Sequence, residues 1–183
     1  MQLNVSPDIK AVFKLLDACP CTVSKATVRA LNKTSTSVRA MAAREIKKDI
    51  GSGITIGEIK KGLTYTRASF NHLSASITAS AKRLSLLRID PTAKQTSTGV
   101  NYRTQGQSKA IAHAFIATMK TGYKGVFVRK GKERLPISEK YGVSIWKVFV
   151  NPTVMATLQT AAKIRFNTVL SQELKFAFSQ SFQ

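Results

Sequence analysis

The chain has 183 residues, 43% of them hydrophobic, and its 29 Lys and Arg against nine Asp and Glu give a formal net charge of +20. This length and hydrophobic content exclude a wholly disordered chain and suit one domain over residues 1–183. The positive charge predicts nucleic acid, an acidic protein surface or anionic lipid as the partner. Lipid is the least favoured of the three, because the sequence has no apolar run of about 18 residues for a membrane-spanning helix.

Residues 1–62 are predicted to be helical. A short amphipathic helix is expected over residues 6–18, because Ser6 suits its cap and Pro7 its first position. The segment Cys19-Pro20-Cys21 ends this helix. A two-residue separation is poor disulfide geometry, and a zinc site needs further soft ligands, so we expect free thiols, no metal and a reducing compartment. The first ten residues lack a secretory pattern, which fits use inside a cell.

A longer helix should run from about Thr22 to Lys48, with apolar residues on one side of its helical wheel and cations on the other. The expected packing face comprises Val28, Leu31, Val38, Ala42 and Ile46. The expected cationic strip comprises Lys25, Arg29, Lys33, Arg39, Arg44 and Lys47. This strip is either a solvated helix face or a surface that binds a polyanion, and the charge of the whole chain favours the second interpretation.

Beyond the glycines at 51 and 53 the pattern changes. Residues 55–62 fit a short helix, in which Thr55 and Glu58 have the spacing of a capping box. Residues 63–145 are predicted to form an antiparallel β region. Strands are expected at Leu63–Phe70, Ser74–Ala81 and Leu84–Ile89, with two more between Ala93 and Ile111. The apolar run Ala112–Met119 fits either a strand or a short helix.

The most patterned stretch is a basic β-hairpin. Its strands are expected at Gly125–Arg129 and Arg134–Ser138, joined at Lys130-Gly131-Lys132, where Gly131 suits a positive φ. The hairpin and its approach carry Lys120, Lys124, Arg129, Lys130, Lys132 and Arg134, with Glu133 as the only acid among them. Such a cluster neutralises phosphates without reading bases, which predicts a sequence-independent and salt-sensitive contact. The alternative is a solvated tip whose lysines keep a β edge from pairing.

After the hairpin, the chain is expected to pass from a turn at Tyr141-Gly142 into the apolar segment Ser144–Val150. Three residues of that segment are candidates for the core or for a subunit interface, namely Ile145, Trp146 and Phe149. Asn151 and Pro152 then suit the start of a closing helix over residues 151–180. Its expected buried residues are Met155, Leu158, Ala162, Phe166, Val169 and Leu170.

The residue inventory predicts no catalytic site, no metal site and no cofactor. The acids are scattered over separate elements, and neither His72 nor His113 belongs to a recognisable catalytic signature. His113 lies beside Phe115 and Ile116 and is expected to be a core histidine. Binding is therefore the expected role, and the predicted fold class is α+β, with an antiparallel β-sheet flanked by a long N-terminal and a long C-terminal helix.

Five segments carry a family pattern in chain order: Ala26–Ile46, Gly99–Tyr102, His113–Met119, Gly125–Arg129 and Arg134–Gly142. Together they resemble the prophage minor tail protein Z family of lambda-like phages. Val143 departs from the pattern, because such proteins often carry proline after the Tyr-Gly pair. The resemblance implies a virion structural protein, assembled in the host bacterial cytoplasm, that acts at the head-proximal end of a tail in tail completion and head–tail joining.

The resemblance also implies a homo-oligomeric ring, commonly a hexamer, around the channel through which the genome passes. Its partners would be the tail tube or terminator proteins, the neck proteins and the genomic DNA terminus. Copies would associate through apolar faces that include Ile145 to Phe149 and through β-edge pairing. The helix strip or the basic hairpin would then face DNA or acidic neighbours. From composition alone, the alternative is a sequence-independent nucleic-acid-binding protein of the nucleoid-associated or ribosomal type.

Overall fold

The computed structural model describes residues 2–5, 20–104 and 106–181. The fold class is α+β, as predicted, with a long N-terminal helix, α2 (Pro20–Ile50), and a long C-terminal helix, α6 (Pro152–Ser181). The described strands are distributed over four small antiparallel sheets rather than one. The chain divides into two compact units, and each is described by itself. That residues 1–183 form a single domain stays a prediction.

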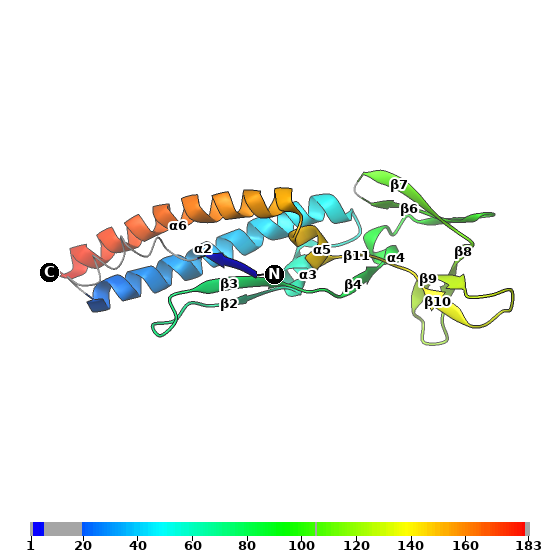
Figure 1. Ribbon diagram of the computed structural model, residues 1–183, viewed down its shortest axis with the longest axis horizontal. Helices are drawn as coiled ribbons and strands as arrows, with labels where there is room; N and C mark the ends of the chain where they lie inside the picture. The colour runs from blue at the N-terminus through cyan, green and yellow to red at the C-terminus, as the bar shows by residue number, and fades with distance from the viewer. Residues whose placement is uncertain (1, 6–19, 105, 182–183) are drawn as a thin grey trace. The chain divides into compact units, whose positions relative to one another are not determined.

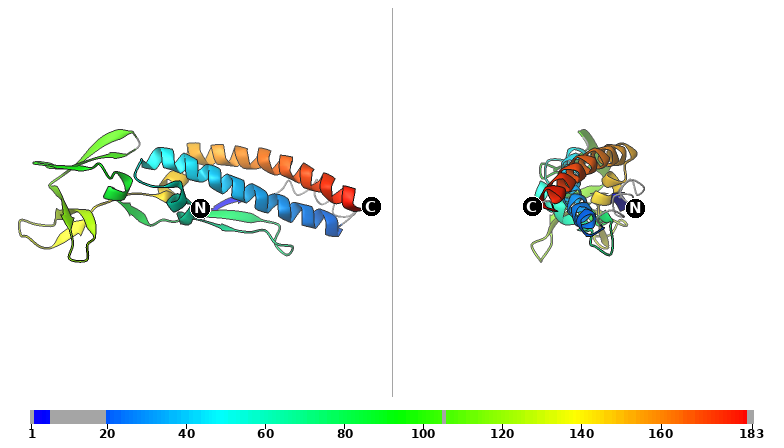
Figure 2. Two further views of the ribbon diagram at one scale, coloured as in Figure 1. Left: turned by 180° about the vertical axis from the view of Figure 1, so that it is seen from behind. Right: turned by 90° about the vertical axis from the view of Figure 1, so that its left-hand side faces the viewer.

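Unit 1 comprises Met1–Ala43, Leu63–Ala79 and Val150–Gln183. Its antiparallel sheet has the order β1-β3-β2. The strands are β1 (Gln2–Val5), β2 (Leu63–Thr66) and β3 (Ala75–Ala79). Helices α2 and α6 run antiparallel and side by side on one side of this sheet (Figures 1 and 2). The predicted strands at 63–70 and 74–81 are confirmed and are shorter than expected.

Small side chains dominate the buried side of α2, which allows its neighbours to approach closely. They are Ala26, Thr27, Ala30, Thr34, Ser35, Ala42 and Ala43. The hydroxyls of Thr27 and Ser35 donate to carbonyls one turn back, at 2.8 and 2.7 Å, so these polar groups are satisfied inside the core. Of the residues predicted to be buried on α2, Val28 is half-buried and the others are buried.

Helix α6 begins as predicted, because the side-chain oxygen of Asn151 accepts a hydrogen bond from the backbone N–H of Thr153 at 3.2 Å. Its buried residues recur at helical spacing: Val154, Met155, Leu158, Ala162, Phe166 and Val169. Leu170, also predicted to be buried, is half-buried. The helix expected over residues 6–18, and Cys19, lie outside the described residues.

Unit 2 comprises Arg44–Gly62 and Ser80–Phe149. Its sheets have the orders β5-β6-β7, β10-β9-β8 and β11-β4. The strands are β4 (Arg83–Ser85), β5 (Lys94–Thr96), β6 (Gly99–Thr104), β7 (Gln107–Ala112), β8 (Ala114–Thr118), β9 (Lys124–Arg129), β10 (Ile137–Glu139) and β11 (Tyr141–Ser144). The short helices are α3 (Ile56–Gly62), α4 (Leu86–Ile89) and α5 (Ile145–Phe149). One core cluster joins Leu86, Val100, Ala114 and Val126.

Several local predictions for unit 2 are wrong. The run Leu84–Ile89 starts in a strand but continues as α4, because a short apolar run does not distinguish the two structures. Tyr141-Gly142 opens β11 instead of forming a turn. His113 is exposed at a φ of 57°, at the bend between β7 and β8, so it is not a core histidine. Between Ala93 and Ile111 there are three strands, not two.

Two glycines of unit 2 are required by geometry. At Gly99 an added Cβ would lie 2.0 Å from the backbone oxygen of Ile111, on the paired strand, so no side chain fits. Gly122 has a φ of 78° in the turn that joins β8 to β9, where its N–H donates to the carbonyl of Met119 at 2.9 Å. The first of these glycines opens the segment Gly99–Tyr102 of the family pattern.

Candidate interaction surfaces

The predicted basic hairpin is present, but its second strand begins later than expected. Strand β9 pairs with β10 in antiparallel register, with Arg129 opposite Ile137. Pro136 has no N–H for a β ladder, so pairing resumes only after it. The backbone N–H of Lys130 donates to the carbonyl of Pro136 at 3.1 Å. Residues 130–136 therefore form a closed loop, called the hairpin loop below.

The hairpin loop exposes three cations, Lys130, Lys132 and Arg134. None of the three forms an ion pair with any residue that the structure describes. Leu135, which follows Arg134 in the hairpin loop, is 67% exposed. Arg134 was expected in a strand but lies in the hairpin loop, because β10 begins only at Ile137. Gly131 was expected at a positive φ but does not adopt one, because the longer loop removes the need for a tight turn.

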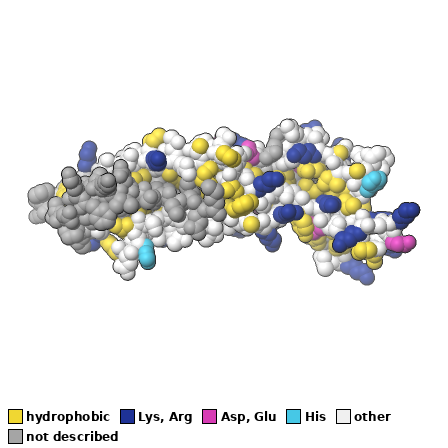
Figure 3. All heavy atoms as spheres, viewed as in Figure 1, with side chains coloured by type: hydrophobic (Ala, Val, Ile, Leu, Met, Phe, Trp, Pro, Cys, Tyr) yellow, Lys and Arg dark blue, Asp and Glu magenta, His cyan; other side chains and the backbone are white. Residues whose placement is uncertain are grey.

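Lys124 and Arg129 lie at the two ends of β9 and are both exposed. The guanidinium carbon of Arg129 is 5.3 Å from the centre of the Phe115 ring, a cation–π contact with the neighbouring strand β8. Arg129 is therefore partly committed to its own sheet. On the face drawn in Figure 3, Lys and Arg side chains gather over β6 to β10 with few acids among them.

The cationic strip of α2 differs from the hairpin loop, because two of its members hold unit 1 together. Lys33 forms an ion pair with Glu173 of α6 at 2.5 Å, and the Glu173 side chain is only 9% exposed. The Nε of Arg39 donates to the carbonyl of Leu63 at 2.7 Å, and its guanidinium lies 5.1 Å from the Tyr65 ring centre. Of the remaining strip residues, Lys25, Arg29 and Arg44 are exposed and Lys47 is half-buried.

The three interface candidates on α5 do not share one environment. Ile145 is 5% exposed and Phe149 is fully buried, so both side chains belong to the core of the protein. Trp146 is 40% exposed. A surface formed by this segment therefore depends on Trp146, while Ile145 and Phe149 stabilise the unit behind it.

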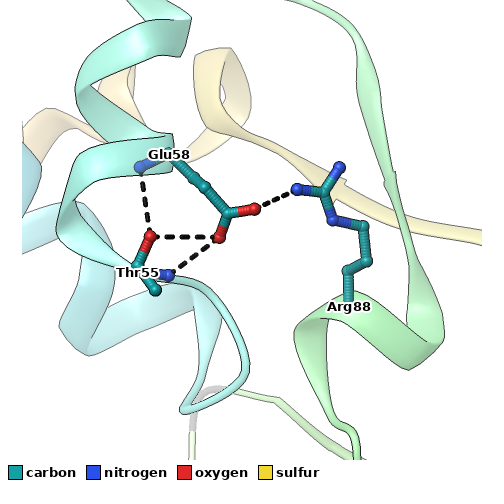
Figure 4. Close-up of polar contacts among 3 residues, drawn as sticks. All are labelled: Thr55, Glu58 and Arg88. Carbon is teal, nitrogen blue, oxygen red and sulfur yellow. Dashed lines mark hydrogen bonds and ion pairs between the residues drawn. The ribbon is translucent and has the colours of Figure 1, made fainter.

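A capping box begins α3, as its spacing predicted. The backbone N–H of Thr55 donates to a Glu58 carboxylate oxygen at 3.1 Å, and the N–H of Glu58 donates to the Thr55 hydroxyl at 3.2 Å. The other carboxylate oxygen of Glu58 pairs with Arg88 of α4 (Figure 4). The pKa of Glu58 lies below its ordinary value, mainly because its carboxylate accepts a hydrogen bond from the Thr55 N–H. The hydrogen bond with Arg88 lowers this pKa further.

Two tyrosines hold Glu139 at the end of β10. The Tyr141 hydroxyl donates to one carboxylate oxygen at 2.7 Å, and the Tyr123 hydroxyl donates to the other. The hydrogen bond to Glu139 raises the pKa of Tyr123 and likewise that of Tyr141, because the carboxylate favours the protonated phenol. Both hydroxyls therefore keep their protons at neutral pH.

Asp90 is a buried carboxylate, 4% exposed, that organises the segment after α4. One oxygen accepts from the N–H and the hydroxyl of Thr92 at 2.9 and 2.6 Å, and the other accepts from the N–H of Arg103 at 2.6 Å. Burial raises the pKa of Asp90, but these hydrogen bonds outweigh burial and leave the pKa below its ordinary value. Asp90 therefore remains charged and ties α4 to β6.

Sequence reasoning missed these acid contacts, except for the capping box. Asp90-Pro91-Thr92 does carry a recognisable signal, because Asp bonds the backbone two residues on in turns that contain proline. The contacts of Arg88 with Glu58 and of Tyr123 with Glu139 join segments that are 30 and 16 residues apart and leave no pattern in the sequence. In the described residues, no group of three or more His, Cys, Asp or Glu could hold a metal ion.

Together, the fold and these surfaces define a basic α+β protein that exposes cations on a hairpin loop and along part of a helix. The chain belongs to the prophage minor tail protein Z (GPZ) family, whose model matches residues 10–183. It is therefore a structural protein of a phage tail, as the resemblance implied. No curated protein matches the chain, and no solved structure does. No helix in the described parts has the length and apolar character needed to cross a membrane.

Proposed function

We propose that the protein completes the tail at its head-proximal end and takes part in joining the tail to the head. Membership of the minor tail protein Z family over residues 10–183 supports this role. The observation that carries the proposal further is the hairpin loop, whose three cations have no ion-pair partner among the described residues. At the head-proximal end, the genome terminus and neighbouring proteins supply the negative groups that a subunit of charge +20 needs.

The subunits form a ring, six-fold by analogy with other proteins at that position, around the DNA channel. Two features support contacts between copies. Trp146 exposes a large aromatic side chain, and β7, at the edge of its sheet, is exposed along almost its whole length. An unpaired β edge of this kind is a template for pairing with another chain. The rotational symmetry and axial position of the subunit in images of intact particles test the ring.

The cations of the hairpin loop contact either the DNA terminus or acidic surfaces of neighbouring tail and neck proteins. The test is the combined reversal Lys130→Glu, Lys132→Glu and Arg134→Glu. Arg129 is left unchanged because its guanidinium stacks on Phe115. We expect plaque titre to fall by more than about tenfold, since like charges at a contact cost several kcal/mol. Electron microscopy then separates the partners: joined particles that fail to retain or eject the genome end indicate DNA, and unjoined heads and tails indicate protein docking.

The matched control reverses three exposed cations of α6, with Lys163→Glu, Arg165→Glu and Lys175→Glu, and changes the net charge equally. Infectivity of the control should exceed that of the hairpin variant. Normal infectivity of the hairpin variant would remove both partner assignments. Equal losses in the two variants would show that net charge, and not the hairpin loop, matters for assembly.

A further inference from the structure

A cleft of about 620 Å³ opens within unit 2, between α3, β4, α4, the end of β10 and the starts of β11 and α5, with Tyr123 from the turn before β9 also lining it. Four cations line it: Lys61, Lys82, Arg83 and Arg88. Two acids, Glu58 and Glu139, also line it, together with apolar side chains of Ile54, Leu84 and Ile145. The cleft is thus a concave, partly apolar site with an excess of positive charge, and it does not include the hairpin loop.

The two acids of the cleft are already engaged. Glu58 accepts from Thr55 with one oxygen and pairs with Arg88 through the other. Both oxygens of Glu139 accept tyrosine hydroxyls. By contrast, Lys61, Lys82 and Arg83 are exposed and form no ion pair with any described residue. The charged side chains of the cleft that lack an ion-pair partner among the described residues are therefore cations.

Arg88 is positioned in advance. Figure 4 shows one terminal guanidinium nitrogen on Glu58 and the other directed away from it. The Arg88 side chain remains 58% exposed, and Glu58 is itself fixed by the capping box. A guanidinium has five N–H donors in a rigid fork, so one held by a first carboxylate can still receive a second anion. Holding the fork in place lowers the entropy cost of binding.

We propose that this cleft binds an acidic peptide segment of a neighbouring protein, with carboxylates on Lys82, Arg83 and Arg88 and an apolar side chain against Leu84. The volume lies in the range of about 300–1,000 Å³ that is typical of ligand-binding clefts. A duplex presents a convex surface, and even a single DNA-binding module buries about 600 Å² or more. The charges of Glu58 and Glu139 oppose an unbroken row of phosphates, whereas spaced carboxylates can avoid them. The site goes beyond the hairpin function, because it uses other residues and is measurable on the isolated protein.

The test is fluorescence anisotropy of the full chain with a short labelled peptide in which several Asp and Glu surround one Leu, at low salt. The cleft variant combines Lys82→Glu with Arg83→Glu, and its matched control combines Lys163→Glu with Arg165→Glu on α6. We expect the cleft variant to bind the peptide at least about tenfold more weakly than the control. The same peptide with Asn and Gln in place of the acids should bind neither the parent nor the control.

Three results would overturn the proposal: no binding to the parent protein, equal affinity of the two variants, or equal affinity of the amide peptide. A fourth result would reassign the cleft to nucleic acid. This result is that the cleft substitutions weaken the binding of a short single-stranded or duplex DNA more than they weaken the binding of the peptide. If the charge reversal prevents folding, judged by the thermal unfolding of Trp146 fluorescence, the pair Lys82→Gln and Arg83→Gln replaces it. Failure here leaves the particle test of the hairpin loop unaffected.

Discussion

The two units of this protein use charge in different ways. In unit 1 two cations of α2 contact neighbouring elements, since Lys33 pairs with the buried Glu173 of α6 and Arg39 donates to the backbone of β2. In unit 2 the structural charges are largely carboxylates, with Asp90 tying α4 to β6 and Glu139 held by two tyrosines. Net charge alone therefore does not identify a binding surface. The cations available to a partner are those that the fold does not use, and the hairpin loop has such cations.

The largest expected effect on stability comes from removing one of the structural carboxylates of unit 2. Asp90→Ala removes the acceptor of three donors from Thr92 and Arg103, two of them backbone N–H groups. We expect a loss of about 2–4 kcal/mol in the free energy of unfolding, because hydrogen bonds to charged groups contribute about 1.5–3 kcal/mol each and are not additive. Urea unfolding followed by fluorescence reports on unit 2, since Trp146 is the single tryptophan. The control Glu133→Ala, on the exposed hairpin loop, should stay within about 0.5 kcal/mol of the parent.

The next effect tests the cation side. Arg39→Ala deletes a hydrogen bond to the Leu63 carbonyl and the contact with the Tyr65 ring. We expect a loss of about 2 kcal/mol, from a charge-assisted hydrogen bond and a partly exposed cation–π contact. Urea unfolding followed by far-ultraviolet circular dichroism measures it through α2 and α6. Arg29→Ala, an exposed cation of the same helix, is the control and should stay within about 0.5 kcal/mol of the parent. An equally small change for Arg39→Ala would mean that the strip is a solvated face throughout.

Acid should weaken unit 2 through the same carboxylates. The pKa values of Asp90 and Glu58 lie below their ordinary values of 3.8 and 4.5 in the folded chain. Their contribution to stability is therefore present above these ordinary values and is lost as the pH falls through the lower folded values. The loss should be smaller than that from Asp90→Ala, because a protonated carboxyl still accepts a hydrogen bond. Unfolding of Asp90→Asn, followed by Trp146 fluorescence across acidic pH, should show a weaker dependence than the parent; an equal slope would assign the effect to other acids.

Local patterns predicted the helical part of the fold well. The helix expected from Thr22 to Lys48 is α2 (Pro20–Ile50), and the one expected over 151–180 is α6 (Pro152–Ser181). Both follow from helical periodicity, and α6 also from its cap and first-turn proline, which act within a few residues. The capping box before α3 was found for the same reason.

Contacts between distant segments were not predictable in this way. Lys33 and Glu173 are 140 residues apart, so nothing in the neighbourhood of Lys33 distinguishes it from the exposed Arg29. The apolar segment 144–150 predicted a buried or an interface role without assigning residues, and only the packing of α5 separates the buried Phe149 from the exposed Trp146. This limit of prediction from sequence is physical, because the burial of a side chain depends on which surfaces of the chain pack together in the fold.

The smallest expected effect on stability is the most informative for function. The triple substitution Lys130→Ala, Lys132→Ala and Arg134→Ala removes the three cations of the hairpin loop, whose side chains form no ion pair with the described residues. We expect the free energy of unfolding, measured by Trp146 fluorescence in urea, to change by no more than about 0.5 kcal/mol, as is usual for exposed sites, and even to rise slightly as like charges are removed. A loss comparable with that of Arg39→Ala would show that these cations stabilise unit 2 itself. Unchanged stability combined with reduced infectivity would instead mean that these cations bind a partner and do not stabilise the fold. The comparison of the two units rests on this distinction between cations that the fold uses and cations that it leaves available.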